Sequence, residues 1–400
     1  MAGSIDLDRL IAACADDSEV AGLRISTELE PLGGPGAPVK PAVYEGGRYQ
    51  LDKRWESPEA EAPVDVVVVD NVPSQANRLE AALRDQVATC GLPELVLDLR
   101  DVGDLPAHLP RQLSSWQFPH RNADAYLRDA DLDGVHFVRT DLGRSIFDAT
   151  PWNAGALVAW FPQALLYGFW QSHLGKKRAN TKHARAWVSE ILGWRPASTT
   201  TRLMGLKGDP MNLSTDEQVT SNPDDRAAWE IGKAKIEGGK TDKLSEMGHG
   251  QVPFMKDNDA APAGISFSRV SQTSNLSTAQ LRHISLGDGS SPDANAAARA
   301  LIAAMGLLGH VAAFGRGFAL RSGADLVPTR TTAAWVEPGE RAPVELPTVA
   351  EAQALVAAAR ERAAAVGVPL DGWGREPIVL TPHENLTKAI RATWPSADED

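Results

Sequence analysis

A polar turn follows the most apolar short run of this sequence. Val66–Val69 predicts a buried strand, and the next segment, DNVPSQANRLEAAL at residues 70–83, reads as the start of a helix. Four polar residues crowd this helix start: Ser74, Gln75, Asn77 and Arg78. Free N–H groups at a helix start, together with such side chains, bind phosphate oxygens. The alternative is ordinary structure, in which Asn71 or Ser74 caps the helix and Arg78 is solvated.

A basic run lies in the middle of the chain, in the segment KKRANTKHAR at residues 176–185. Its Lys and Arg side chains are Lys176, Lys177, Arg178, Lys182 and Arg185. Trp170 and Trp187 flank the run, and aromatic rings beside cations are typical of surfaces that bind single-stranded nucleic acid. An ordinary basic loop is the alternative.

A glycine-rich segment partly matches an RNA-binding pattern. Residues 316–319, with the sequence RGFA, fit the first four positions of the RNA-recognition strand motif, and the match ends at Leu320 and Arg321. A match this short is weak, and a phenylalanine such as Phe318 is more often a core residue than a stacking surface.

Catalytic and metal-binding signatures are missing from the sequence. It has no GxSxG, HExxH or Walker motif and no GxGxxG opening a helix, and its nine His residues lack the spacing of metal ligands. Cys14 and Cys90 are far apart, and they offer neither a disulfide framework nor a thiolate zinc site. The sequence therefore predicts no metal, no cofactor and no enzyme activity.

The net charge of −12 argues at first against a nucleic-acid partner, because a binder must neutralise phosphates. The charge is unevenly distributed, however. Residues 171–202 carry +6 and residues 299–330 carry +3, whereas residues 56–70 and 209–230 each carry −5. An acidic exterior around a basic groove fits a protein that holds one nucleic acid and stays soluble elsewhere.

The sequence predicts a cytoplasmic protein with no membrane span. The N-terminal segment MAGSIDLDRL lacks the pattern of a signal peptide, and the apolar stretch at residues 154–170 is short for a membrane helix. The low cysteine content agrees with a reducing compartment.

Hydrophobic periodicity and capping signals indicate interleaved strands and helices, as in an α+β or α/β fold. Strands are expected at residues 22–32, 64–69, 92–99 and 318–321, and helices at residues 71–90, from residue 277, at 292–314 and at 348–367. Residues 101–134 look irregular and partly helical, and residues 205–262 look like a loop or an extended hairpin.

Five blocks of the sequence, taken in order, resemble one known family. They are DNVPSQANRLEAAL, LLYGFWQSHLGKKRANTKHARAWVSEI, KLSEMGHGQVPF, SFSRVSQTSNLSTAQLR and AAFGRGFALRSGADL. Together they resemble the backbone subunit of the CRISPR Cascade complex of type I-G, formerly I-U, which is a Cas seven protein of the RAMP superfamily. The resemblance covers about residues 22–326.

This resemblance implies an α+β fold, built as a modified RNA-recognition (ferredoxin-like) palm. Residues 1–400 would form a single domain, with a helical finger inserted at 101–134 and a thumb region at 205–262. The protein would polymerise along CRISPR RNA and present it for pairing with target DNA, without cutting nucleic acid itself. Its partners would be CRISPR RNA, target DNA, further copies of itself and other Cascade subunits, namely a Cas five/Cas six fusion and a large subunit.

The family blocks also imply the RNA-facing residues. These are Ser74, Gln75, Asn77, Arg78, Lys176, Lys177, Arg178, Lys182, Arg185, Arg269, Arg316 and Arg321. The thumb at residues 238–262 carries an apolar cluster, and three of its side chains are expected to act as a wedge between bases: Val252, Phe254 and Met255. The alternative is that this cluster folds back on the palm.

A metal-dependent ribonuclease on the same palm is the rival interpretation. Some related backbone subunits of other CRISPR types use an Asp to cut target RNA, and Asp52, Asp70 and Asp257 are the candidates in this chain. None of them has a partner at a recognisable spacing. A small-molecule enzyme that uses the GGPGAP loop at residues 33–38 is a third and weaker possibility.

Overall fold

The computed structural model describes most of the chain, and the chain divides into two compact units. The described residues are 3–45, 48–103, 105–172, 174, 181–197, 210–211, 213, 217–222, 225, 227–232, 239–249 and 264–394. The first unit comprises residues 1–42, 51–196 and 266–400. The second unit comprises residues 43–50 and 197–265.

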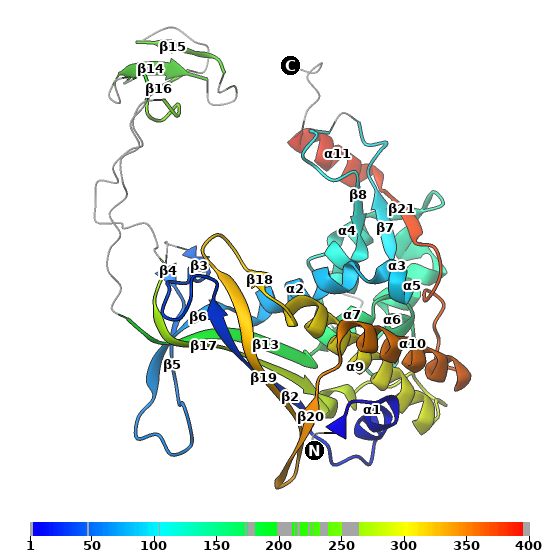
Figure 1. The fold of residues 1–400 in the computed structure, drawn as a ribbon. Coiled ribbons are helices and arrows are strands. Elements are labelled where there is room, and N and C mark those ends of the chain that lie inside the picture. The colour runs from blue at the N-terminus through cyan, green and yellow to red at the C-terminus, as the bar shows by residue number, and fades with distance from the viewer. Residues whose placement is uncertain are drawn as a thin grey trace. The chain divides into compact units, whose positions relative to one another are not determined.

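A large, mainly antiparallel sheet spans the first unit (Figure 1). Its strands in spatial order are β1 (Gly3–Ser4), β20 (Glu340–Glu345), β19 (Asp325–Glu337), β2 (Gly22–Pro31), β17 (Phe267–Ser277), β13 (Trp187–Pro196), β6 (Val64–Asp70) and β5 (Leu51–Arg54), and β18 (Phe318–Ala319) pairs with β19. Leu23, Ile25 and Leu29 of β2 are buried, as period-two alternation predicts. The expected strands at residues 22–32 and 64–69 are therefore confirmed.

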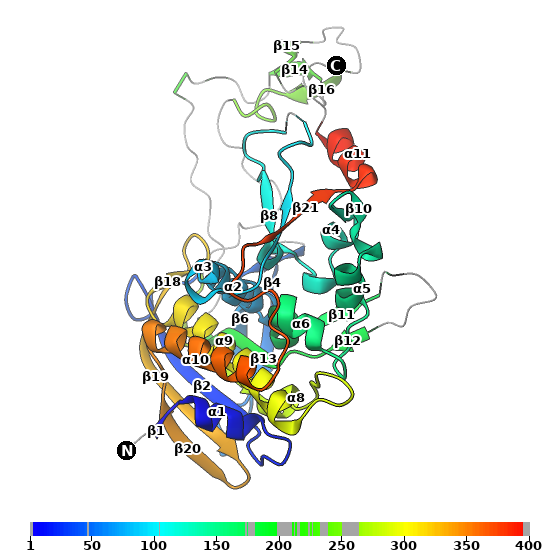
Figure 2. The ribbon, with the colours of Figure 1, turned by 90° about the vertical axis from the view of Figure 1, so that its right-hand side faces the viewer.

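Helices cover one face of this sheet (Figures 1 and 2). They include α1 (Leu7–Cys14), α2 (Val72–Arg84), α9 (Pro292–Phe314) and α10 (Val349–Ala365), and α9 packs against the other three. The Ser291 hydroxyl caps α9 by accepting from the Ala294 N–H at 3.1 Å. The Thr348 and Glu351 capping box opens α10. Both helix starts are those predicted from the sequence.

Helix α9 is the central core element of the first unit. By length and composition alone it is apolar enough to cross a membrane, but 89% of its most apolar window is buried inside the protein. Alanine and glycine residues dominate it, which lets neighbouring helices approach closely. Gly306 is such a position, because a Cβ there would lie 2.9 Å from the Trp187 ring.

The helix that follows β6 is shorter than predicted. The apolar stripe expected over residues 71–90 is split between α2, which ends at Arg84, and the one-turn helix α3 (Val87–Cys90). Ala76, Leu79 and Leu83 of α2 are buried, as expected. Other helices of the first unit include α5 (Asp141–Phe147), α6 (Gly155–Trp160), α7 (Pro162–Tyr167), α8 (Thr278–Leu281) and α11 (Glu384–Thr393).

Residues 101–134, expected to be irregular and partly helical, contain helical turns and also two strands, β8 (Gln112–Ser114) and β9 (Ala130–Leu132), of a smaller sheet in the first unit. Its strands in spatial order are β10 (Val135–His136), β9 (Ala130–Leu132), β21 (Ile378–Pro382), β7 (Leu95–Asp98) and β8 (Gln112–Ser114). The described helical parts of the insertion are single turns: η2 (Ser115–Gln117), η3 (Arg121–Ala123) and α4 (Ala125–Arg128). The C-terminal strand β21 runs parallel to β7, and no local pattern in the sequence predicts this pairing.

Three further pieces of sheet lie in the described residues. In the first unit, β11 (Phe169–Gln171) pairs with β12 (Thr181–His183). In the second unit, β14 (Gln218–Ser221) lies between β15 (Trp229–Ile231) and β16 (Lys240–Lys243), and β3 (Val43–Tyr44) pairs with β4 (Arg48–Tyr49). The predicted thumb region at residues 205–262 lies within the second unit. The mixture of separate helices and antiparallel sheet confirms the α+β class.

Candidate nucleic-acid interface

The polar turn after β6 is organised around one buried carboxylate, that of Asp70. This side chain has no exposed surface, and four side chains donate to its oxygens. The donors are Ser74 Oγ at 2.9 Å, Gln75 Nε2 at 2.5 Å, Arg78 Nε at 2.9 Å and Arg321 Nη2 at 2.7 Å. Buried charges require such pairing, so the turn is polar mainly because Asp70 must be satisfied.

Two of these donors are arginines from distant parts of the sequence. Arg78 also donates to the Leu320 carbonyl at 3.0 Å, and Arg321 donates to the Lys40 and Val69 carbonyls. Their side chains remain 28% and 23% exposed. Two guanidinium groups against one carboxylate leave a net positive charge beside the start of α2. Asn71 caps this helix, since its Oδ1 accepts from the Ser74 N–H at 3.1 Å.

The expectation that Gln75 faces RNA is wrong. Gln75 is fully buried, and its Oε1 accepts from Ser189 Oγ at 2.9 Å and from Gln272 Nε2 at 2.8 Å. It belongs to a polar network between α2 and the sheet, and it does not lie on the face opposite the apolar stripe. Asn77 is exposed, as expected of an RNA-facing residue, and Ser74 is partly buried.

A groove of about 1050 Å³ begins at the first residue of α2, Val72. It joins the helix start to the second predicted RNA-binding segment. Its polar and aromatic lining residues are His120, Arg121, Tyr167, Phe169, Trp170, Ser172, Lys182, His183 and Arg185. We call it the α2 groove. The groove therefore extends from Val72, the first residue of α2, to Lys182 and Arg185 of the basic segment, and the polar residues 74–78 do not line it.

The hairpin of β11 and β12 forms one wall of the α2 groove. Trp170 lies directly opposite Lys182 in the register of this pair, and Lys182 Nζ is 4.9 Å from the centre of the indole ring. Trp170 is 59% exposed. Trp187, the other predicted stacking residue, is only 1% exposed and packs in the core, so that expectation is wrong.

A buried ion pair lies at the floor of the α2 groove. Arg121 Nε and Nη2 each donate to the Glu80 carboxylate at 2.7 Å, and Arg121 Nη1 donates to the Gly168 carbonyl at 2.9 Å. Burial raises the pKa of Glu80, and the Arg121 guanidinium opposes that rise. Arg121 has a φ of 55°, a conformation that costs energy for a residue with a side chain and that often marks functional sites.

The cations of the α2 groove give it a positive electrostatic potential. Partial burial lowers the pKa of Arg185, the nearby Arg121 lowers it further, and Glu80 opposes both. Lys182 is exposed beside them. Arg121 and Glu80 were not predicted from the sequence, although the position of Glu80 in the helix was a signal for a buried ion pair. Glu80 lies on the buried side of α2 next to Leu79 and Leu83, and a charge there requires a buried partner.

The other predicted RNA contacts lie elsewhere or outside the described residues. Arg269 is exposed on β17, where its guanidinium lies 4.6 Å from the centre of the Trp194 ring and 3.5 Å from Glu28 Oε1. Arg316 is exposed beside a separate cavity of about 780 Å³ at the end of α9. The predictions that fall outside the described residues are Lys176, Lys177, Arg178, Val252, Phe254 and Met255.

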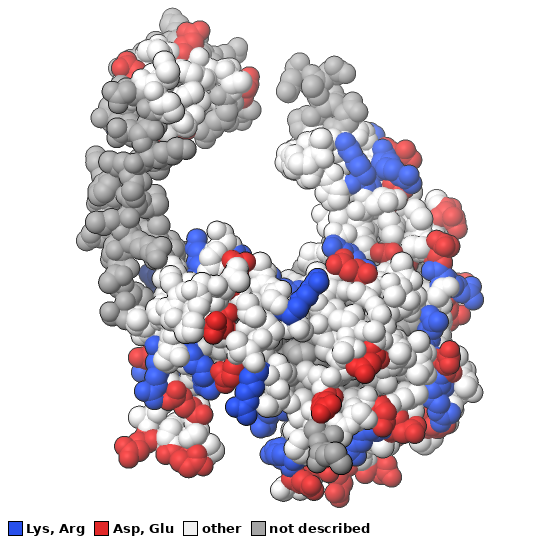
Figure 3. Space-filling model, viewed as in Figure 1, with Lys and Arg blue, Asp and Glu red and all other residues white. Residues whose placement is uncertain are grey.

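The surface charge agrees with a local rather than a general attraction for phosphate. On the face drawn in Figure 3, basic and acidic residues are interspersed among uncharged surface. This pattern fits the net charge of −12.

The candidate residues of the rival ribonuclease have cationic partners. Asp70 is held by Arg78 and Arg321, and Asp52 Oδ2 accepts from Arg54 Nε at 2.6 Å. Asp257 lies outside the described residues. Within the described part of the chain, no three His, Cys, Asp or Glu residues are grouped to hold a metal ion.

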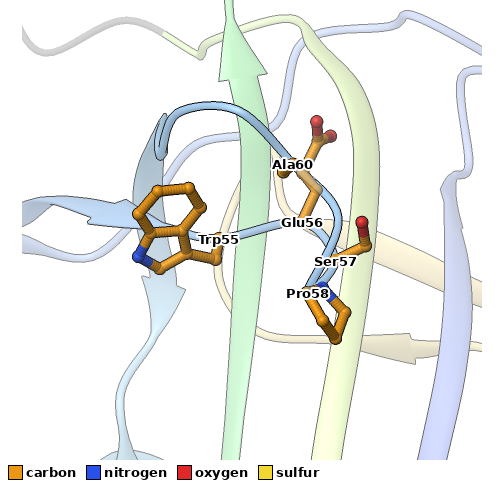
Figure 4. Close-up of a pocket in the computed structure, with 5 residues that line it drawn as sticks. All are labelled: Trp55, Glu56, Ser57, Pro58 and Ala60. Carbon is orange, nitrogen blue, oxygen red and sulfur yellow. The ribbon is translucent and has the colours of Figure 1, made fainter.

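A shallow pocket of about 590 Å³ on the loop after β5 offers less chemistry. Trp55, Glu56, Ser57, Pro58 and Ala60 line it, and Figure 4 shows the Trp55 indole on the opposite side of the loop from the Pro58 ring. Glu56 is paired with Arg195, and hydrogen bonding to that arginine lowers the pKa of Glu56. The pocket holds no uncompensated charge that would select a ligand.

A family model matches part of the chain. Residues 23–197 match the model of the family described as CRISPR-associated protein GSU0053. This match supports a CRISPR-associated protein. The matched segment is less than half of the 400 residues, and it contains β2, β6, α2 and the hairpin of β11 and β12. A search of curated proteins gives no match.

Proposed function

We propose that this chain is the RNA-binding backbone subunit of a type I-G Cascade complex. It polymerises along CRISPR RNA in the cytoplasm and presents the guide for pairing with target DNA in antiviral defence. The other Cascade subunits, a Cas five/Cas six fusion and a large subunit, are its further partners. The family match supports the CRISPR setting, and the block resemblance supports the backbone role.

One observation carries the proposal: the α2 groove joins the start of α2 to the basic hairpin. Lys182, Arg185 and the exposed Trp170 line this groove together with Val72 of α2. Cations that neutralise phosphates and a ring that accepts a base are the two components of single-strand recognition. Sequence recognition of the target comes from base pairing with the guide RNA, and the protein itself holds the guide.

Co-purification with RNA tests this function. The full chain is expressed with a CRISPR array, purified by size exclusion, and its absorbance at 260 nm is compared with that at 280 nm. We expect RNA of defined length with the wild-type protein and much less RNA with the double variant Lys182→Glu, Arg185→Glu.

The matched control is the double variant Arg100→Glu, Arg144→Glu. These side chains are 65% and 52% exposed and lie outside the α2 groove, and the variant has the same net charge as the first. It should retain RNA. Wild-type protein that purifies free of RNA at low salt would contradict the proposal. Cleavage of labelled target RNA in the presence of Mg²⁺ would favour the ribonuclease instead.

A further inference from the structure

The hairpin of β11 and β12 presents one indole ring at a fixed position. On its inner side, Phe169 and His183 are 7% and 5% exposed, and their rings stack with centroids 6.0 Å apart. His183 Nε2 lies 2.9 Å from the Leu165 carbonyl oxygen, which ties the hairpin to α7. On its outer side, Trp170 and Lys182 are exposed, and all four of these residues line the α2 groove. Packing of Phe169 and His183 therefore holds the side of the hairpin that carries Trp170 and Lys182 in place.

The exposed pair combines an aromatic surface with positive charge. Lys182 Nζ interacts with the Trp170 ring, and a cation in this position also attracts an anion that approaches the indole. Arg185 adds a second cation at the same wall. The complementary ligand is a flat ring attached to negative charge. A nucleobase in a phosphate chain has both features, whereas an aromatic side chain of a protein lacks the adjacent anion.

We propose that Trp170 stacks on one unpaired base of the bound RNA while Lys182 and Arg185 hold neighbouring phosphates. This inference rests on the proposed RNA-binding function. Bases inside a double helix are covered on both faces by their neighbours, so the Trp170 platform selects single-stranded RNA. Because every base has a π-face, the platform tolerates all four bases.

Binding of a short single-stranded RNA and of a duplex of the same length tests the platform. A third probe keeps the sugar–phosphate chain but lacks bases. The full-length variants are Trp170→Ala, Trp170→Phe and the control Trp152→Ala, which removes a tryptophan that is 75% exposed outside the α2 groove. Thermal melting checks that each variant is folded.

Trp170→Ala should weaken binding of the single strand about tenfold and leave binding of the baseless strand unchanged. Trp170→Phe should recover most of the loss, and Trp152→Ala should bind like the wild type. Two results would overturn the platform and leave the proposed function standing. One is that Trp170→Ala loses as much affinity for the strand without bases as for the single-stranded RNA. The other is that Trp170→Ala loses no affinity although the wild type binds RNA.

Failure of the wild-type protein to bind any of the three probes would contradict the proposed function itself. Reduced self-association of Trp170→Ala with unchanged RNA affinity would mean that Trp170 contacts a protein, and it would also overturn the platform.

Discussion

Asp70 determines what the neighbouring polar residues do. The sequence places Ser74, Gln75, Asn77 and Arg78 in one region, but it does not show which of them Asp70 recruits. Gln75 turns inward because Ser189 and Gln272 offer it a buried network across the sheet. Such partners are separated from Gln75 by more than a hundred residues, so no local pattern could reveal them. Of these four side chains, that of Asn77 is the exposed one.

Asn77 and Arg78 should therefore respond differently to replacement by alanine. Arg78→Ala removes charged hydrogen bonds to Asp70 and should lower the free energy of unfolding by about 1.5–3 kcal/mol. Asn77→Ala should change it by less than about 0.5 kcal/mol, because the side chain is on the surface. Urea denaturation measures both values. Equal destabilisation by the two variants would show that the Asp70 network does not support the fold.

The Arg121 and Glu80 pair should behave as one unit. Removing one partner leaves a buried charge unpaired, and we expect Glu80→Gln and Arg121→Gln each to lower the free energy of unfolding by about 3–5 kcal/mol. The double variant should cost much less than the sum, because it leaves no unpaired charge. A double-mutant cycle by chemical denaturation gives the coupling. Additive losses would contradict this account of the groove floor.

Elements with local signals were predicted well from the sequence. Helix α9 begins after Ser291 and ends at Phe314 because capping and composition determine both ends locally. The strands within residues 101–134 were not predicted, because β8 pairs with β7 and β9 pairs with the C-terminal strand β21 as well as with its neighbour β10. The α2 groove likewise depends on long-range packing of α2 against the region of Arg121, which local periodicity cannot show.

Helix α9 makes the stability of the protein depend on pH through His310. This side chain is 3% exposed, its ring centre is 5.5 Å from that of Trp187, and burial lowers its pKa from 6.5 to about 4. Between these values the unfolded chain binds a proton that the folded chain excludes. Stability should therefore fall as the pH drops through this window, by about 2 kcal/mol from this group at pH 5.

Replacing His310 by Phe should flatten this dependence. The free energy of unfolding of His310→Phe should decrease less than that of the wild type between pH 7 and pH 5, as measured by urea denaturation at each pH. The control His283→Asn changes an exposed histidine and should keep the wild-type slope. An unchanged slope in His310→Phe would show that other groups control the acid sensitivity.

At the scale of the whole molecule, a net charge of −12 coexists with a locally positive groove. The net charge alone argues against a nucleic-acid partner, whereas the charge distribution along the sequence allows one. The residues of the α2 groove belong to the first unit, and the predicted thumb region at residues 205–262 belongs to the second. The proposed RNA contact in the α2 groove therefore uses residues of the first unit.

Ultraviolet cross-linking of the full chain to CRISPR RNA, followed by mass spectrometry of the digested peptides, tests the central claim most directly. The chain is cross-linked in its purified complex, and peptides that carry a nucleotide are identified. We predict cross-links in the peptides that contain Asn77, Trp170, Lys182 or Arg185. Cross-links confined to β19 and β20, with the peptides of the α2 groove unmodified, would contradict the claim that this groove binds the guide.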